Sequence, residues 1–497
     1  MDDIFSEYFK YESSSDLEGF VKTPTEVWQK IGEQKALENF QTAAKTVPAY
    51  KDFLKKNFIK PETINTIEDF KKIPTTNKEN YFKKYSLGDL VVGGDLGNST
   101  VIHYSSGSTG KSSFWPKTKI QDLASYKGME LLYKIYFDLG EISTLFINCY
   151  GMGPWTAGEM VHSATKMMSE KGLKISIISP GTNSELFFNI FQGLADQFDQ
   201  IIIGGYSSSL RDLVQEGVRR GIKFKSYKIK ILSGGEKYSE NWRQFMIKHL
   251  GLAEPHRSVA AVLGMSEVGV AAISTPFIDY LRILFHEDQV LAQKTFGRID
   301  LPSLLQYIPP SRYIEVVNNN IIITAMGNIP IIRYDTKDHG QIFTPEQLLS
   351  VLPEGTKDKY LLVDKHFSIP NLPVLAVNGR IDKTIILFGA NIYPEQLTFV
   401  MERPELEKYL TGRFIAEKLE TNDADVYLSI ALELREGIRI TDNHKREIKA
   451  IIVDNLRSIN SEYANVLSSV GIKSEPRLVF KKYDPGKFVA VSGKSRV

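Results

Sequence analysis

Short apolar runs alternate with amphipathic segments between about residues 145 and 255. The runs LFINCY, KISIIS, QIIIGGY and KIKILS are rich in isoleucine and have the length of buried strands. The segments between them, such as NSELFFNIFQGLADQF and SLRDLVQEGVRRG, place apolar residues at helical spacing. Ser239 is suited to cap the helical segment SENWRQFMIKHL, and Gly251 follows its last residue. This alternation predicts a parallel sheet covered by helices on both faces.

The rest of the chain shows other patterns. Apolar residues from Trp28 to Val47 recur at helical spacing until Pro48, which predicts a helical N-terminal region. Between 312 and 345, the runs YIEVV, IIITAMG and IPIIRYD are separated by turn residues and predict a β-rich subdomain. A smaller unit with its own strands and helices follows NLPVLAVNGRID. We therefore predict an α/β fold with a large N-terminal domain over residues 1–381, built of parallel sheet layers and the β-rich subdomain. A small C-terminal α+β domain is predicted over residues 382–497.

The composition is that of an ordinary globular protein. Of 497 residues, 42% are hydrophobic and 24% are charged, and the net charge of +2 gives no general attraction to nucleic acid or anionic lipid. The single cysteine, Cys149, excludes an internal disulfide and a multi-cysteine zinc cluster. The acidic start MDDIFSEYFKYESSS is unlike a signal peptide, and no apolar run approaches the roughly 20 residues of a membrane span. We expect a cytoplasmic protein with no nucleic-acid or membrane partner.

The loop SSGSTGKSS, residues 105–113, has the composition of a phosphate-binding loop. It is not a Walker loop, because Ser105 stands where that pattern requires its first glycine. Pro116 would also break the helix that a Walker lysine begins. VIHY before the loop and SSFWP after it are extended in character, so the loop is predicted to join two strands. Its small residues, its hydroxyls and Lys111 remain well suited to hold phosphate oxygens.

Further motifs follow this loop in a fixed order. They are SGGE at 233–236, LGMSEVG at 263–269, RYDTKD at 333–338, NGRIDKTIILFGANIYPEQL at 378–397 and a basic GKSR at 493–496. The set resembles the adenylate-forming superfamily, most closely its phenylacetate–coenzyme A ligase branch. VPAYKDFL, IPTTNKENYF and YGMGPWTAGEMVHSATKMMSEKG are similar to other segments of that branch. The resemblance covers nearly the whole chain and implies an AMP-forming acid–thiol ligase.

The resemblance also implies a role for each motif. The residues that would hold the β- and γ-phosphates of ATP are Ser105, Ser106, Gly107, Ser108, Thr109, Gly110 and Lys111. Gly234, Gly235 and Glu236 would line the adenine pocket, with Met265 against the base, and Gly264 is a further expected nucleotide-binding residue. Ser266 would approach the α-phosphate, and Glu267 would carry magnesium. Asp338, with Arg380 beside it, would hold the ribose hydroxyls.

Two further positions concern the small domain. Asp382 falls at the hinge of the family, and Lys494 matches its catalytic lysine, so Lys494, Glu267 and Lys111 are the expected catalytic residues. The alternative for Lys494 is a solvated tail residue with no catalytic role, because it lies in a basic segment at the C-terminus of the chain. Lys487 in the same segment is a rival for the catalytic role, although GKSRV matches the ending of the branch better.

Two departures from the family pattern bear on the nucleotide site. Leu263 stands where an aromatic residue usually precedes Gly264, so the packing of adenine or of the acyl group is expected to differ. Lys337 replaces a common glycine before Asp338, which puts the shape of that turn in question. Taken alone, Asp338 would be a solvated acid in a loop, and Glu267 would cap a helix. Because both occur within motifs that follow one another in the order of the family, a role in the nucleotide site is favoured.

The expected reaction is ATP- and magnesium-dependent activation of a small carboxylic acid to an acyl-adenylate, with release of pyrophosphate. Transfer of the acyl group to the thiol of coenzyme A would follow. One alternative is delivery to a carrier protein, another protein or an amine, since the chain has no residue-level signature for coenzyme A. A second alternative is a non-catalytic binding protein on the same fold. The family favours an aryl acid, and the sequence does not identify the acid further.

Overall fold

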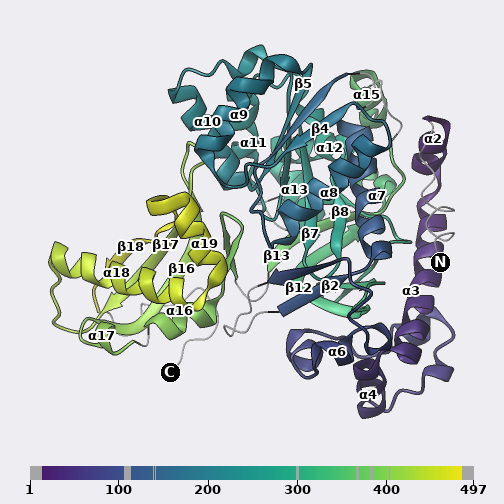
Figure 1. The fold of residues 1–497 in the computed structure, drawn as a ribbon, viewed down its shortest axis with the longest axis horizontal. Helices are drawn as coiled ribbons and strands as arrows, with labels where there is room; N and C mark the ends of the chain where they lie inside the picture. The colour runs from purple at the N-terminus through teal and green to yellow at the C-terminus, as the bar shows by residue number, and fades with distance from the viewer. Residues whose placement is uncertain are drawn as a thin grey trace.

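The chain folds around one large mixed sheet and a separate, smaller sheet near the C-terminus (Figure 1). The computed structural model describes residues 14–105, 113–137, 139, 142–297, 301–364, 369–380, 384–401 and 403–483. The strands of the large sheet lie in the order β10-β11-β12-β13-β9-β8-β7-β6-β5-β3-β4. Among these described residues, no helix combines the length and the apolar character that crossing a membrane requires.

The strands β4, β3, β5, β6 and β7 are parallel, as the alternating pattern predicts. Their bounds are Thr144–Asn148 (β3), Ile175–Ile178 (β4), Gln200–Gly205 (β5), Ile229–Gly234 (β6) and Val259–Met265 (β7). The helices between them are α8 (Thr156–Glu170), α9 (Ser184–Leu194), α10 (Ser207–Arg219) and α11 (Glu240–Leu250). The Ser239 side chain accepts a 3.0 Å hydrogen bond from the Trp242 amide, and Gly251 is left-handed, which confirms both predicted ends of α11.

Apolar side chains cover both faces of this parallel region, because successive residues of a strand point to opposite sides. Phe146 of β3 packs in a cluster with side chains of α8 and of α7 (Lys119–Tyr136). Its neighbours Leu145 and Ile147 belong to a second cluster, which they share with side chains of α9, α10 and α11. The helices therefore form a layer on each side of the parallel strands.

Antiparallel strands continue the same sheet beyond β7. They are β8 (Gly269–Ile273), β9 (Ser303–Gln306), β13 (Val374–Arg380), β12 (Ile331–Phe343), β11 (Asn320–Ala325) and β10 (Tyr313–Val317). The β-rich region predicted over 312–345 is thus present but shares one sheet with the parallel strands. The link is β9, where Gln306 is paired with Ile273 of β8 on one side and Val374 of β13 on the other.

Helices of the N-terminal region cover the antiparallel end of the sheet. Phe40 and Phe70 pack with Ile321 and Ile323 of β11 in one buried cluster, which accounts for the apolar spacing of the N-terminal region. The helices before the first strand are α2 (Ser14–Lys22), α3 (Thr25–Thr46), α4 (Pro48–Lys56), α5 (Ile67–Phe70) and α6 (Leu87–Leu90). Those that follow β8 and β12 are α12 (Pro276–Glu287), α13 (Gln289–Phe296), α14 (Pro345–Ser350) and α15 (Thr356–Val363).

The C-terminal part has a sheet and a core of its own, and Figure 1 shows it beside the larger body. Its three-stranded sheet has the order β16-β17-β18, and a small hairpin precedes it. Its elements are β14 (Ile385–Leu387), β15 (Ala390–Ile392), α16 (Pro394–Met401), α17 (Pro404–Glu407), β16 (Leu410–Glu420), β17 (Val426–Leu434), α18 (Asp442–Ile459), α19 (Ser461–Val470) and β18 (Arg477–Lys481). The predicted hinge, Asp382, lies outside the described residues.

Candidate active site

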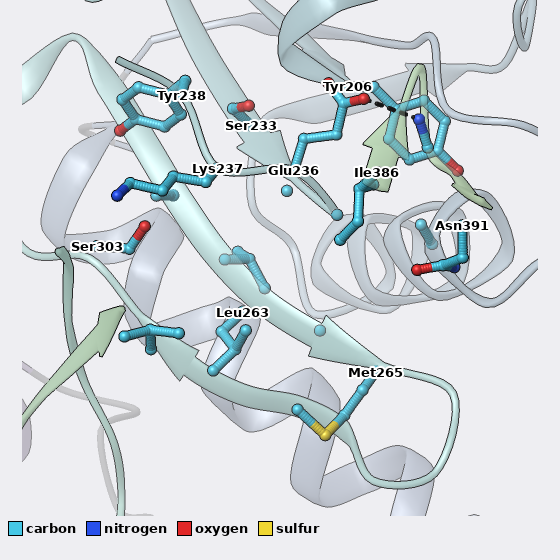
Figure 2. A pocket seen from close by; sticks show the side chains of 18 of the residues that line it. Tyr206, Ser233, Glu236, Lys237, Tyr238, Leu263, Met265, Ser303, Ile386 and Asn391 are labelled. Carbon is cyan, nitrogen blue, oxygen red and sulfur yellow. Dashed lines mark hydrogen bonds between the residues drawn. The ribbon is translucent and has the colours of Figure 1, made fainter. Parts of the chain in front are cut away.

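A cavity of about 1470 Å³ opens where the parallel strands β5, β6 and β7 end. Ligand pockets of roughly 300–1,000 Å³ are usual, so this one has room for more than a single small molecule. The hairpin β14–β15 and the strand β16 also reach the cavity, with Ile386, Asn391 and Lys418 among the lining residues. Figure 2 shows Glu236 beside Tyr206, with Leu263 and Met265 along a neighbouring strand and Ile386 and Asn391 facing the same space.

The cavity brings together predicted site residues from motifs that are far apart in the sequence. Those that line it are Ser105, Gly234, Gly235, Glu236, Gly264, Met265, Ser266, Glu267 and Asp338. Arg380 is the ladder partner of Asp338, at the end of β13. The other predicted residues lie outside the described part of the chain: Ser106, Gly107, Ser108, Thr109, Gly110, Lys111, Lys487 and Lys494.

Two antiparallel strands flank the phosphate-loop candidate. They are β1 (Val101–Ser105) and β2 (Ser113–Lys117), with Ser105 paired opposite Ser113. The indole of Trp115 donates a 2.9 Å hydrogen bond to the Ser105 hydroxyl and so anchors the start of the loop. The prediction that the loop joins two strands is confirmed.

The segment after β6 is shaped by Tyr206. Gly235 has φ +77°, and a Cβ there would lie only 2.9 Å from the Tyr206 ring, so both backbone conformation and space require glycine. Gly389 of the β14–β15 hairpin faces the same ring, at 2.5 Å from an added Cβ. The Tyr206 ring therefore packs against the segment after β6 on one side and against the β14–β15 hairpin of the C-terminal part on the other.

Glu236 has a role that the sequence did not indicate. Its carboxylate accepts hydrogen bonds from the hydroxyls of Ser207 and Ser208, at 2.9 and 2.8 Å, and from the Ser208 amide at 3.1 Å. Its other oxygen accepts from the Gly389 amide at 3.0 Å, the bond that is dashed in Figure 2. The side chain thus fixes the wall of the cavity and links β6 to the C-terminal hairpin.

Glu267 lies in the tight turn between β7 and β8, and its carboxylate is buried. The Lys78 ammonium is 2.9 Å from Oε1, and the Tyr334 hydroxyl donates to the same oxygen at 3.1 Å. Burial alone would raise the pKa of Glu267, but the charge and hydrogen bond of Lys78 outweigh it, so the pKa lies below its ordinary value. An ionised carboxylate can hold a metal cation. The ammonium beside it can contact the anionic ligand that carries this cation.

Lys78 is a cavity residue that sequence reasoning missed. It belongs to IPTTNKENYF, a segment that resembles the family without marking this lysine. The N-terminal segment reaches the large sheet through the Thr76 amide, which donates to the Arg333 carbonyl at 2.9 Å. This long-range contact brings Lys78 to Glu267, and no local signal predicts it.

The backbone just before Asp338, within β12, has an unusual conformation. Lys337 has φ +66°, in the left-handed region that glycine favours. Its ammonium is 2.7 Å from Asp335, whose other carboxylate oxygen accepts the Lys337 amide at 3.0 Å. The expected turn is thus part of strand β12, where the pairing with β11 shifts register between Asn320↔His339 and Ile322↔Asp335, and Asp338 lines the cavity.

An apolar wall lies on the α8 side of the cavity. Tyr150 and Trp155, which precede α8, and Tyr206, which precedes α10, line it. The rings of Tyr150 and Tyr206 meet edge to face at 5.2 Å. Thr156, at the start of α8, donates to the Ser266 hydroxyl at 2.9 Å, which brings this wall next to the β7–β8 turn.

The residues present suit a magnesium ion that arrives with a polyphosphate. Within the described ranges, no group of three or more histidine, cysteine, aspartate or glutamate side chains could hold a metal. Magnesium is commonly bound by one or two carboxylates together with phosphate oxygens, so Glu267 fits that mode of binding.

Comparison with known proteins gives a consistent picture. No family model matches the chain. It is 23% identical over 381 residues to a phenylacetate–coenzyme A ligase of Thermus thermophilus, covering 76% of each protein. A 2-hydroxyisobutyryl-CoA ligase in its thioesterification state superposes with a TM-score of 0.65 at 14% identity, over 98% of this chain and 93% of that one. The same ligase in a postadenylation state gives 0.56 at 14% identity and the same coverage.

Together, these comparisons support an adenylate-forming protein, with an AMP-forming acid–thiol ligase as its enzyme class. Within that superfamily the chain is phenylacetate–coenzyme A ligase-like.

Proposed function

We propose that this enzyme activates a small carboxylic acid with ATP and passes the acyl group to coenzyme A. In the first step a carboxylate oxygen attacks the α-phosphorus, and the bond to pyrophosphate breaks. In the second, the thiol sulfur attacks the acyl carbon, AMP leaves with the bonding electrons, and the thiol proton is lost. The observation that carries the proposal is the convergence of Gly235, Ser266, Glu267 and Asp338 on one cavity.

The proposed roles follow from chemistry and position. Asp338 would accept hydrogen bonds from the ribose hydroxyls, and Ser266 would face the α-phosphate. Glu267 would hold magnesium, which neutralises charge on the phosphates as the carboxylate approaches. The loop from Ser105 to Lys111 and the tail lysine Lys494 would supply the remaining donors and cations. Because the substrate carboxylate and the α-phosphate are both anions, positioned cations contribute more to lowering the barrier of this step than a general acid or base does.

The apolar wall formed by Tyr150, Trp155 and Tyr206 supports an aromatic or other compact apolar acid. We expect the protein, with magnesium and ATP, to exchange labelled pyrophosphate into ATP only when an accepted acid is present. A panel of aryl and aliphatic acids would find the substrate. Release of orthophosphate in place of pyrophosphate for every accepted acid would contradict adenylation. Parallel assays with coenzyme A, carrier proteins and amines would then identify the acceptor.

Contacts between the large body and the C-terminal part suggest how the second step is organised. Arg211 of α10 donates to the Asp423 carbonyl at 3.1 and 2.8 Å and lies 3.2 Å from the Asp425 carboxylate. Asp212 pairs with Lys473 at 2.6 Å. We propose that this docked arrangement serves thioester formation, which is supported by the better superposition on the thioesterification state of the 2-hydroxyisobutyryl-CoA ligase.

Arg211→Met should therefore slow thioester formation by about tenfold while leaving adenylation nearly unchanged, because it weakens one docked state. Pyrophosphate exchange measures the first step, and consumption of supplied acyl-adenylate with coenzyme A measures the second. The matched control is Arg220→Met. Arg220 pairs with Glu185 and Glu216 at 2.8 Å, within the large body only. Equal effects of Arg211→Met on both steps would contradict the assignment.

A further inference from the structure

The turn between β7 and β8 carries Ser266 and Glu267 to the cavity. It is tight, because the Val268 amide donates to the Met265 carbonyl at 3.2 Å and Gly269 follows with φ +76°. A turn this short leaves several of its own carbonyls without partners in the strand ladder. The position of both site residues therefore depends on what those carbonyls contact.

All three carbonyls from residue 266 to 268 accept hydrogen bonds from buried side chains of other elements. Lys117, the last residue of β2, donates to the carbonyls of Ser266 and Glu267, the second at 3.1 Å. Gln121 of α7 donates to the Glu267 carbonyl at 3.2 Å. Arg312, just before β10, donates to the Val268 carbonyl. The turn is thus fixed from two separate segments of the chain, the β2–α7 junction and the residue before β10.

Two of these donors are deeply buried basic side chains, Lys117 at 3% exposed and Arg312 at 2%. Burying an ammonium is costly unless an anion or several acceptors compensate it. Within the described chain the hydrogen bonds of Lys117 go to carbonyls; burial lowers the pKa of Lys117 to about 7, and the negative charge of Glu267 only partly opposes this. A neutral donor such as Gln121 could satisfy a carbonyl at lower cost. Lys117 instead reaches two consecutive carbonyls of the turn, those of the site residues Ser266 and Glu267.

We propose that Lys117 is a positioning residue for adenylation: by holding the carbonyls of Ser266 and Glu267, it fixes the turn that presents both residues to the cavity. This inference rests on the proposed function. Lys117 acts through the turn, since its ammonium contacts the backbone of these residues and does not line the cavity.

The test compares Lys117→Met with Lys230→Met. Lys230 is also 3% exposed and donates to a backbone carbonyl, that of Arg257, at 2.9 Å, but it lies outside the cavity lining. We expect both variants to lose similar thermal stability. Only Lys117→Met should lower the maximal rate of pyrophosphate exchange, by about 10–100-fold, as is usual for residues that orient a ligand of a metal. Its KM for the acid should stay near the wild-type value, and its half-saturating magnesium concentration should rise several-fold.

A second readout does not depend on turnover. Calorimetric titration with ATP and magnesium should show weaker binding to Lys117→Met and unchanged binding to Lys230→Met. If Lys117→Met does not fold, Gln121→Met, which removes a neutral donor from the same Glu267 carbonyl, should weaken magnesium dependence in the same direction. Wild-type rate, magnesium dependence and nucleotide binding in the folded Lys117→Met or Gln121→Met protein would overturn the proposal. Failure of the wild-type protein to exchange pyrophosphate with any acid would instead refute the proposed function, and the binding comparison would still test Lys117.

Discussion

Replacing Lys494 by alanine is expected to abolish most acyl-adenylate formation. The proposed reaction brings a carboxylate to the α-phosphate of ATP, and the resemblance to the ligase branch assigns the neutralising charge to this lysine. Loss of one charge-assisted contact in a closed site costs about 10²–10³ in rate. Pyrophosphate exchange, measured with saturating ATP and acid, would show the loss. Consumption of supplied acyl-adenylate with coenzyme A should be far less affected, because no phosphate is attacked in that step.

Lys487→Ala is the matched control for this prediction. It removes the same charge from the same basic segment, seven positions earlier in the chain. We expect a mild effect on both half-reactions. Equally small effects of the two substitutions would mean that the basic segment is only a solvated tail, and a larger effect of Lys487→Ala would transfer the catalytic role to that residue.

The second large effect is expected for Glu267→Gln. Glutamine fills the same space but carries no charge, so it binds magnesium weakly and removes the carboxylate that lies 2.9 Å from the Lys78 ammonium. We expect adenylation to fall by about 10²–10³ and the magnesium requirement to rise. Rates measured over a range of magnesium concentrations would separate weakened metal binding from a slower chemical step.

Glu130→Gln provides a comparison for the loss of a buried, lysine-paired carboxylate. Glu130 is 2% exposed and lies within 3.3 Å of Lys127, Lys134 and Lys171, away from the cavity lining. This substitution should lower stability without changing the magnesium dependence of exchange. If both substitutions reduce exchange only in proportion to the loss of folded protein, the carboxylate of Glu267 has no specific part in the reaction.

Local sequence patterns predicted the elements that depend on local physics. The run KIKILS, the cap Ser239 and Gly251 specified β6 and α11 because strand periodicity, capping and left-handed glycine act within a few residues. The position of Pro116, which excludes a helix after the loop, correctly predicted that the phosphate-loop candidate lies between two strands. The ordered motifs also predicted which residues of β6, β7 and β12 line the cavity.

Long-range pairing was decided only by the tertiary structure. The sequence pattern over 312–345 predicted a β-rich subdomain, but β9 and β13 join these strands to the parallel ones in a single sheet. The sequence could not predict this, because pairing partners far apart in the chain leave no local pattern. The same holds for the site: Lys78 reaches Glu267, Lys117 reaches the turn that carries it, and Glu236 accepts the Gly389 amide. The sequence by itself determined the local elements and the class of chemistry. Which buried charges and donors surround the reacting groups followed from packing between distant segments, where burial and electrostatic partners are set by the whole fold.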